Sequence, residues 1–187
     1  MNTTNDVANR RYGVIAQALH WLTVAMVTAQ FVLIDAAEVT PLEIKNPKML
    51  GYHKSVGETV LVLSIVRLVW RATHPPPALP LSIPKRQRTL AHVTHGIFYC
   101  LLFTIPISGL LISFASGKNI NWFGFFTVPN FFAPGKIATK IFAQMHDSLA
   151  AVLFFTVLVH VAAALKHHLW DKDQVLNRML PRFMTRK

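Results

Sequence analysis

The stretch QMHDSLAAVLFFTVLVHVAAALKHHLW, residues 144–170, places four histidines in or beside an apolar run long enough to cross a membrane. Two of them, His146 and His160, are 14 residues apart. In an α-helix this step leaves two side chains about 40° apart in azimuth and about 21 Å apart along the axis. Ionisable side chains inside a membrane usually face the interior of a helix bundle and mark a functional path. The spacing therefore predicts two sites, one in each half of the bilayer.

Each site needs a second ligand from another helix, and two histidines stand at matching depths. His53 begins the second apolar segment on the side of His146, and His20 lies a few residues into the first segment, roughly level with His160. Facing imidazoles with no Cys, Asp or Glu at the same point favour bis-histidine ligation of haem iron, whereas zinc usually takes three or four ligands. The chain has no CxxCH motif, so we expect a non-covalent b-type haem at each site.

Further polar residues are expected around the inner site. His95 opens the third apolar segment on the inner side and is the alternative partner of His160; otherwise it is expected to bond a haem propionate. Arg67 lies 14 residues after His53 and returns to the same helix face at the inner depth, where a buried arginine needs an anionic partner. A propionate could supply that charge, with Arg71 assisting nearer the surface.

His167 and His168 lie one to two turns beyond His160, at the expected inner interface. We consider them candidates for a quinone headgroup or proton-exchange site, because histidine changes charge near neutral pH. A structural role is the alternative.

Membrane helices must position these residues. The chain has 187 residues, of which 52% are hydrophobic and 14% charged, and its mean hydropathy is +0.39. Four segments have the roughly 20-residue length of a membrane span, namely 14–36, 51–70, 91–115 and 146–170. We therefore expect residues 1–187 to form a single all-α domain, an integral membrane four-helix bundle.

The basic residues indicate how the bundle is oriented. Thirteen of the 19 lie at the expected inner ends and connections: Arg10, Arg11, Arg67, Arg71, Lys85, Arg86, Arg88, Lys166, Lys172, Arg178, Arg182, Arg186 and Lys187. Because positive charge accumulates on the cytoplasmic side, both termini are predicted to be cytoplasmic. The net charge of +11 is then explained by topology and contact with anionic lipid, and a nucleic-acid partner is not expected.

Three other segments complete the prediction. Residues 73–84 (THPPPALPLSIP) are proline-rich and predict an irregular inner linker. Residues 116–144 contain NWFGFFTVPNFFAPG, which is too short and too broken to span and predicts an interfacial flap over the outer end. The basic tail DKDQVLNRMLPRFMTRK is expected to lie on the inner leaflet.

Several motifs in this order resemble the bacterial cytochrome b561 family over about residues 11–181. They are RYGVIAQALHW, GYHKSVG, RLVWRATHPPP, LAHVTHGIFY, HDSLAAVLFF and HVAAALKHHLWDKDQVLNRMLP. The resemblance implies a multi-pass protein of the bacterial cytoplasmic (inner) membrane with two b-type haems. It also implies that the axial ligands are His20, His53, His146 and His160. The outer connection GKNINWFGFFTVPNFFAPG departs from the superoxide oxidase branch and leaves the electron donor open.

One branch of this family passes electrons from periplasmic superoxide to ubiquinone. We therefore expect an oxidoreductase in which electrons enter at the outer haem, reach the inner haem and reduce a quinone, the donor being a small anion or a protein. Two alternatives belong to other classes. One is an electron-transferring anchor subunit of a larger dehydrogenase complex, and the other is a haem-free, histidine-lined transporter of metal or protons.

Overall fold

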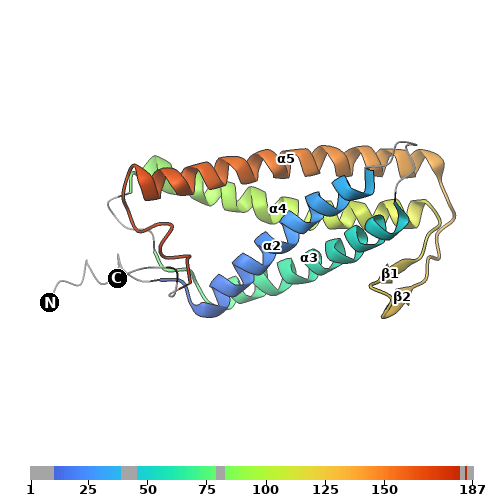
Figure 1. Ribbon diagram of the computed structural model, residues 1–187, viewed down its shortest axis with the longest axis horizontal. Helices are drawn as coiled ribbons and strands as arrows, with labels where there is room; N and C mark the ends of the chain where they lie inside the picture. The colour runs from blue at the N-terminus through green and yellow to red at the C-terminus, as the bar shows by residue number, and fades with distance from the viewer. Residues whose placement is uncertain (1–10, 39–45, 79–82, 182–183, 185–187) are drawn as a thin grey trace.

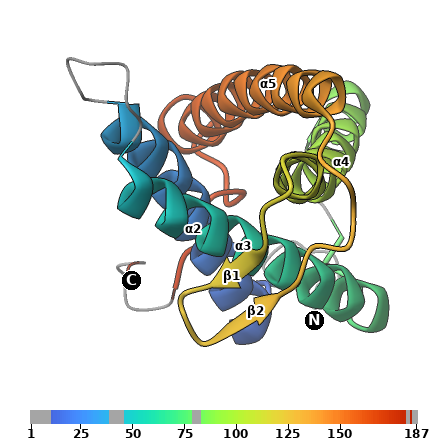
Figure 2. The same cartoon turned by 90° about the vertical axis from the view of Figure 1, so that its right-hand side faces the viewer.

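The computed structural model describes residues 11–38, 46–78, 83–181 and 184, and they form an elongated bundle of helices (Figure 1). The helices are α2 (Val14–Glu38), α3 (Pro47–Thr73), α4 (Lys85–Ala115) and α5 (Lys136–Leu169). Seen along the bundle, α2 packs on α3, α3 packs on α4, and α4 packs on α5 (Figure 2). Within the described ranges, no Cα atom of α5 comes within 8 Å of one in α2 or α3.

Every helix is longer than the span predicted from hydropathy. The largest corrections are at the starts of α4 and α5, which begin at Lys85 and Lys136, six and ten residues before the predicted spans. Hydropathy finds the apolar core of a helix, whereas lysine and glutamine at its ends continue the same backbone hydrogen bonding in the interfacial region. At the start of α3, the Asn46 side chain accepts from the backbone N–H groups of Lys48 and Met49, and Pro47 suits the first helical position.

Three helices, α2, α4 and α5, are long and apolar enough to cross a membrane by length and composition. The fourth predicted span lies in α3, which the same criteria do not select among the described residues. The reason is its charge, because Lys54, Glu58 and Arg67 all fall within residues 51–70. Side-chain burial is sparse, and large apolar side chains such as Val159 (66% exposed) and Phe155 (65%) line the outside of α5. Such a surface suits lipid rather than water.

Small polar residues occupy the tightest contacts between helices. Ser55, Ser64 and Ser108 are among the most deeply buried side chains of the described residues, with at most 2% exposed. Small side chains allow membrane helices to approach closely, and their hydroxyls bond locally. Helix α4 also continues through Pro106, which the sequence places inside the span.

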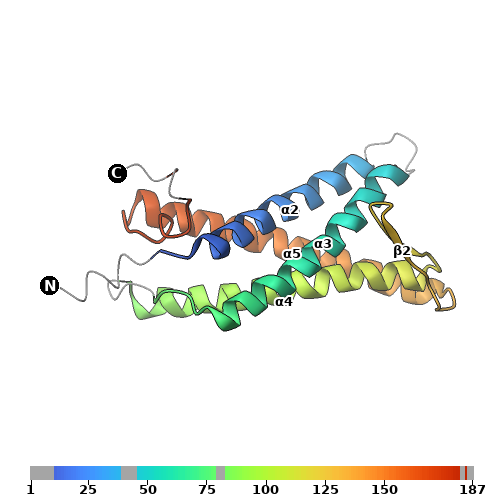
Figure 3. The ribbon, with the colours of Figure 1, turned by 90° about the horizontal axis from the view of Figure 1, so that it is seen from below.

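A short antiparallel hairpin covers the N-terminal end of α3. Its strands are β1 (Ile120–Trp122) and β2 (Phe126–Val128), and it lies across the end of the bundle (Figures 2 and 3). The Ser55 hydroxyl donates to the Asn121 carbonyl at 3.0 Å and accepts from the Phe123 N–H at 3.0 Å. The Trp122 indole N–H donates to Thr59. The flap predicted for residues 116–144 is therefore a hairpin docked on α3, and helix α5 replaces its last nine residues.

The C-terminal segment folds across the opposite end, where the sequence suggested a segment lying on the membrane. The Arg178 guanidinium donates to the Ala78 carbonyl at 2.9 Å, and its own carbonyl accepts from the Gln17 side chain at 3.1 Å. The Trp21 indole N–H donates to the Met179 carbonyl. Burial lowers the pKa of Arg178. These bonds join the tail to α2 and to the proline-rich linker, whose residues 79–82 lie outside the described residues.

Candidate haem-binding sites

The outer site is a facing pair of histidines from α3 and α5. The ring centres of His53 and His146 are 6.2 Å apart, and both side chains are half-buried. Two metal–nitrogen bonds of about 2 Å, plus about 1 Å from each nitrogen to its ring centre, give about 6 Å for imidazoles sharing one metal ion. The observed separation agrees with that value.

Hydrogen bonds fix the proton on each of these two rings. The Nδ1 atom of His53 donates to the Gln30 carbonyl at 3.2 Å, and the Nδ1 atom of His146 donates to the Ile105 carbonyl at 3.0 Å. A carbonyl oxygen only accepts, so Nδ1 must carry the hydrogen in both neutral rings. The lone pair then resides on Nε2, which is the atom left to bind a metal. Metal-bound histidines usually donate their other N–H in this way.

Residues of α4 and α2 that the sequence analysis missed complete the outer site. The Ser108 side chain is fully buried, its Oγ lies 2.8 Å from His146 Nδ1, and it donates to the Ile105 carbonyl at 2.7 Å. A Cβ atom at Gly109 would lie 3.3 Å from His146 Cε1. The sequence signal was the small pair Ser108-Gly109 after Pro106, which indicates close helix packing but not the partner.

Gln30 contacts α3 with its side chain as well as its backbone. A Cβ atom at Gly57, one turn from His53, would lie 2.9 Å from the Gln30 amide nitrogen. The Gln30 side-chain oxygen is buried and has no hydrogen-bond partner in the structure. A buried amide oxygen without a donor costs free energy. This region of the outer site therefore holds a hydrogen-bond acceptor that has no donor among the described protein atoms.

The inner site brings together three histidines. The rings of His95 and His160 are 5.9 Å apart, and His20 lies close enough to interact electrostatically with both. The His95 Nδ1 donates to the Ala91 carbonyl of its own helix, which leaves its Nε2 lone pair available. The His20 Nδ1 instead accepts from the Arg67 guanidinium at 3.1 Å. The choice between His20 and His95 as the partner of His160 stays a prediction.

Two arginines border this inner cluster. The guanidinium carbons of Arg67 and Arg71 lie 6.0 Å and 5.9 Å from the centre of the Tyr99 ring, within cation–π range. Arg67 thus contacts both His20 and Tyr99 from α3. Two guanidinium groups therefore lie at the depth predicted for the haem propionates. A propionate is negatively charged, and an arginine can pair with it through two hydrogen bonds.

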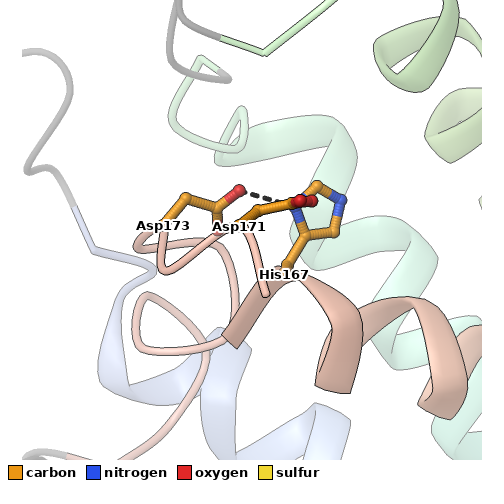
Figure 4. Close-up of side chains that lie close together, drawn as sticks. All are labelled: His167, Asp171 and Asp173. Atoms are coloured by element: carbon orange, nitrogen blue, oxygen red, sulfur yellow. Dashed lines mark hydrogen bonds and ion pairs between the residues drawn. The ribbon is translucent and has the colours of Figure 1, made fainter. Parts of the chain in front are cut away.

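His167 and His168, the predicted pair at the inner end of α5, have different environments. His167 is bonded to a carboxylate, and His168 is exposed. The His167 Nδ1 lies 2.5 Å from an oxygen of Asp173 and 3.4 Å from one of Asp171 (Figure 4). Asp171 also pairs with Lys166 at 2.6 Å. Ligand atoms of His167 and the two aspartates lie within 4.8 Å of one another. The Lys166 ion pair already neutralises one carboxylate, so we interpret the group as an ion-pair network.

The spacing of the helices fits a flat cofactor between the pairs. Both predicted pairs join α5 to a helix whose described backbone does not approach it within 8 Å, namely α3 for His53 and α2 for His20. Directly packed helices have axes about 8–10 Å apart, which leaves no room for a macrocycle between them. The donor set and this spacing are together compatible with haem.

Apolar helices with histidines facing one another across their interior define a membrane protein equipped for electron transfer. The chain belongs to the prokaryotic cytochrome b561 family, whose model matches residues 11–182. It is therefore an oxidoreductase of the bacterial membrane, in a family of helical bundles that bind b-type haem.

Curated relatives agree with this assignment. The chain is 37% identical to cytochrome b561 homolog 2 of Escherichia coli K12 over 174 residues, covering 91% of each protein. It is 31% identical to the probable superoxide oxidase CybB of Yersinia pestis over 175 residues, covering 93% of this chain and 98% of that protein. It is also 27% identical to cytochrome b561 homolog 1 of Escherichia coli K12, covering 88% and 93% respectively.

Proposed function

We propose that this single-domain protein binds two b-type haems in the bacterial inner membrane and transfers electrons from a periplasmic donor to ubiquinone. The observation that carries the proposal is the facing pair His53 and His146, 6.2 Å apart with both Nδ1 atoms donating to carbonyls. Each haem, when bound, supplies a one-electron carrier. Histidines on both faces of the iron would favour electron transfer over oxygen binding.

The inner ligands in this proposal are His160 and His20. The two predicted pairs would both bridge α5 to a helix that its backbone does not contact, whereas His95 lies on α4, which packs directly on α5. His95 would then serve as a neighbour of the inner haem. Arg67 and Arg71 would hold its propionates, because a bidentate guanidinium pairs well with a carboxylate.

Orientation and span number are part of the same proposal. Helix α3 would cross the membrane beside the three more apolar helices, with Arg67 turned toward His20 and Tyr99 in the interior rather than toward lipid. Both termini would be cytoplasmic. The Tyr12 N–H donates to the Arg178 carbonyl at 3.2 Å, which keeps the two described ends of the chain on one side.

Superoxide is the donor we favour, by analogy with the name of the Yersinia pestis relative. Lys54 directly follows His53, and Lys118 lies close enough to interact with it electrostatically. A positive outer surface raises the encounter rate of a small anion. The lysines would attract superoxide before it reaches the haem site. Because salt screens this attraction, high salt should slow haem reduction by superoxide.

The quinone site would lie at the inner end of α5. His167, held by Asp173, could deliver a proton to a reduced quinone, and Lys166 links this network to an apolar recess on the same end of α5. The recess has a volume of about 510 Å³ and is lined by Ala162, Leu165, Lys166, Leu169 and Trp170. These residues all lie on one face of α5 and at its C-terminal cap, so the recess is open to the surrounding lipid, from which a quinone would enter.

The deciding experiment is haem quantitation with reduced-minus-oxidised spectra on the purified wild type and the alanine variants of the four predicted ligands. We expect two haems per chain in the wild type and one in His53→Ala and in His146→Ala. His74→Ala is the control, because His74 is exposed and stacks on Trp70. Two haems retained in His146→Ala would contradict the ligand assignment.

The donor is tested on the same preparations. Superoxide generated enzymatically in aerated buffer should reduce the haems, and added ubiquinone should reoxidise them. If superoxide fails while a co-purifying dehydrogenase reduces the haems, the chain acts as the anchor subunit of a larger complex.

A further inference from the structure

We propose that Ser108 is a positioning residue that orients the His146 imidazole and sets the reduction potential of the outer haem. The inference rests on the proposed ligation by His146 and extends it to a residue of another helix. Ser108 lies on α4, and its side chain is completely buried against α5.

The first step of the argument is the direction of the hydrogen bonds. The Ser108 hydroxyl donates to the Ile105 carbonyl at 2.7 Å, so its hydrogen is already used. The His146 Nδ1–H points toward that same carbonyl, 3.0 Å away, and toward Ser108 Oγ, 2.8 Å away. The hydroxyl oxygen therefore accepts from the imidazole, because its lone pairs are what remain available.

The second step is what two acceptors do to the ring. The Ile105 carbonyl and the Ser108 hydroxyl oxygen each draw the Nδ1 hydrogen toward themselves. This raises the electron density on Nε2 and makes the imidazole a stronger ligand for a metal. A stronger donor stabilises the oxidised, more positive iron and lowers the reduction potential. The Nδ1 atom of His53 donates to the Gln30 carbonyl over a longer distance, 3.2 Å.

The third step is steric. The Gly109 backbone lies beside the same edge of the ring, where an added Cβ would come within 3.3 Å of His146 Cε1 and 3.6 Å of His146 Nδ1. Ser108 and Gly109 are consecutive, so one turn of α4 both bonds the ring and limits its rotation. A serine bonded only within its own helix could do neither.

The test is a redox titration of purified, fully haem-loaded Ser108→Ala. The outer haem is identified as the one lost in His146→Ala. We expect Ser108→Ala to keep both haems and to raise the outer haem's reduction equilibrium constant about fivefold, because one hydrogen bond is lost. This corresponds to about 40 mV for a one-electron couple. The inner haem should keep its potential.

The matched control is Ser64→Ala, which removes an equally buried hydroxyl that donates only to the Val60 carbonyl of its own helix. An unchanged outer potential in Ser108→Ala, or the same shift in Ser64→Ala, would overturn the inference. Loss of the outer haem alone in Ser108→Ala would support positioning. A wild type without the outer haem would refute the proposed function instead.

A second variant crowds the Nδ1–Cε1 edge of the His146 ring. Gly109→Ala should displace His146 by a few tenths of an ångström and change the electron paramagnetic resonance g-values of the outer haem, with haem content retained. Gly51→Ala is its control, since an added Cβ there meets nothing within 4 Å. Identical spectra for Gly109→Ala and wild type would contradict the contact.

Discussion

His53 and His146 lie on helices whose described backbones do not touch, yet their rings are 6.2 Å apart in the interior of the bundle. Each ring is held from outside its own helix, His53 by the carbonyl of Gln30 in α2 and His146 by that of Ile105 in α4. All four helices therefore contribute to one site. Two imidazoles fixed in this way need little reorganisation when a metal binds between them.

The same geometry predicts which histidine completes the inner site. We expect His20→Ala to lose the inner haem and His95→Ala to keep it with a shifted potential, because His95 and His160 lie on directly packed helices. Haem content and redox titration on both variants provide the measurement. Retention of the inner haem in His20→Ala and its loss in His95→Ala would reverse the assignment.

The ion-pair network at the end of α5 predicts a defect in quinone reduction. His167→Ala should slow electron transfer to ubiquinone about tenfold or more, because a positioned proton donor is lost, and haem content should stay normal. Asp173→Asn should have a similar but smaller effect, since it orients the ring. Stopped-flow reoxidation of the reduced protein measures the rate. Exposed His168→Ala is the comparison, and an equal defect there would remove the special role of His167.

The hydrogen bond from Arg178 to the Ala78 carbonyl is expected to stabilise the inner end of the bundle. Arg178→Met should lower the free energy of unfolding by about 1–3 kcal/mol, since the buried, charged Arg178 side chain no longer donates to the Ala78 carbonyl. For a chain of this length that corresponds to a Tm lower by roughly 2–12 °C. Thermal unfolding in detergent provides the measurement. Lys85→Ala, at an exposed position, should leave Tm unchanged, and a wild-type Tm in Arg178→Met would show that the tail is not anchored through this contact.

The two hydrogen bonds between Ser55 and the hairpin are expected to hold the hairpin against α3. Ser55→Ala removes the acceptor for the Phe123 N–H and the donor to the Asn121 carbonyl. Hydrogen exchange of residues 120–128 should become faster while that of α5 stays the same, because local opening costs less free energy. Ser64→Ala is again the matched control. Unaltered protection of the hairpin in Ser55→Ala would mean that the Trp122–Thr59 bond holds it alone.

The existence of the helices followed directly from composition, but their ends did not. Apolar runs located the central part of all four helices, because the cost of placing polar groups in lipid is local and additive along the chain. The first ten residues of α5, from Lys136, were missed because membrane hydropathy carries no information about helix outside the hydrocarbon. Among the described residues, the charges of α3 leave it outside the three helices that are long and apolar enough to cross a membrane. The pairing of His53 with His146 nevertheless requires α3 to lie in the bundle.

The sequence alone determined the depth of each histidine, because an α-helix converts residue number into distance along its axis. It also determined the family, through motifs spread over most of the chain. Only the tertiary structure decided which side chains meet, because contact between helices depends on their packing and rotation rather than on depth. That packing brought His95 beside His160, bonded His20 to Arg67, and buried Ser108 against His146.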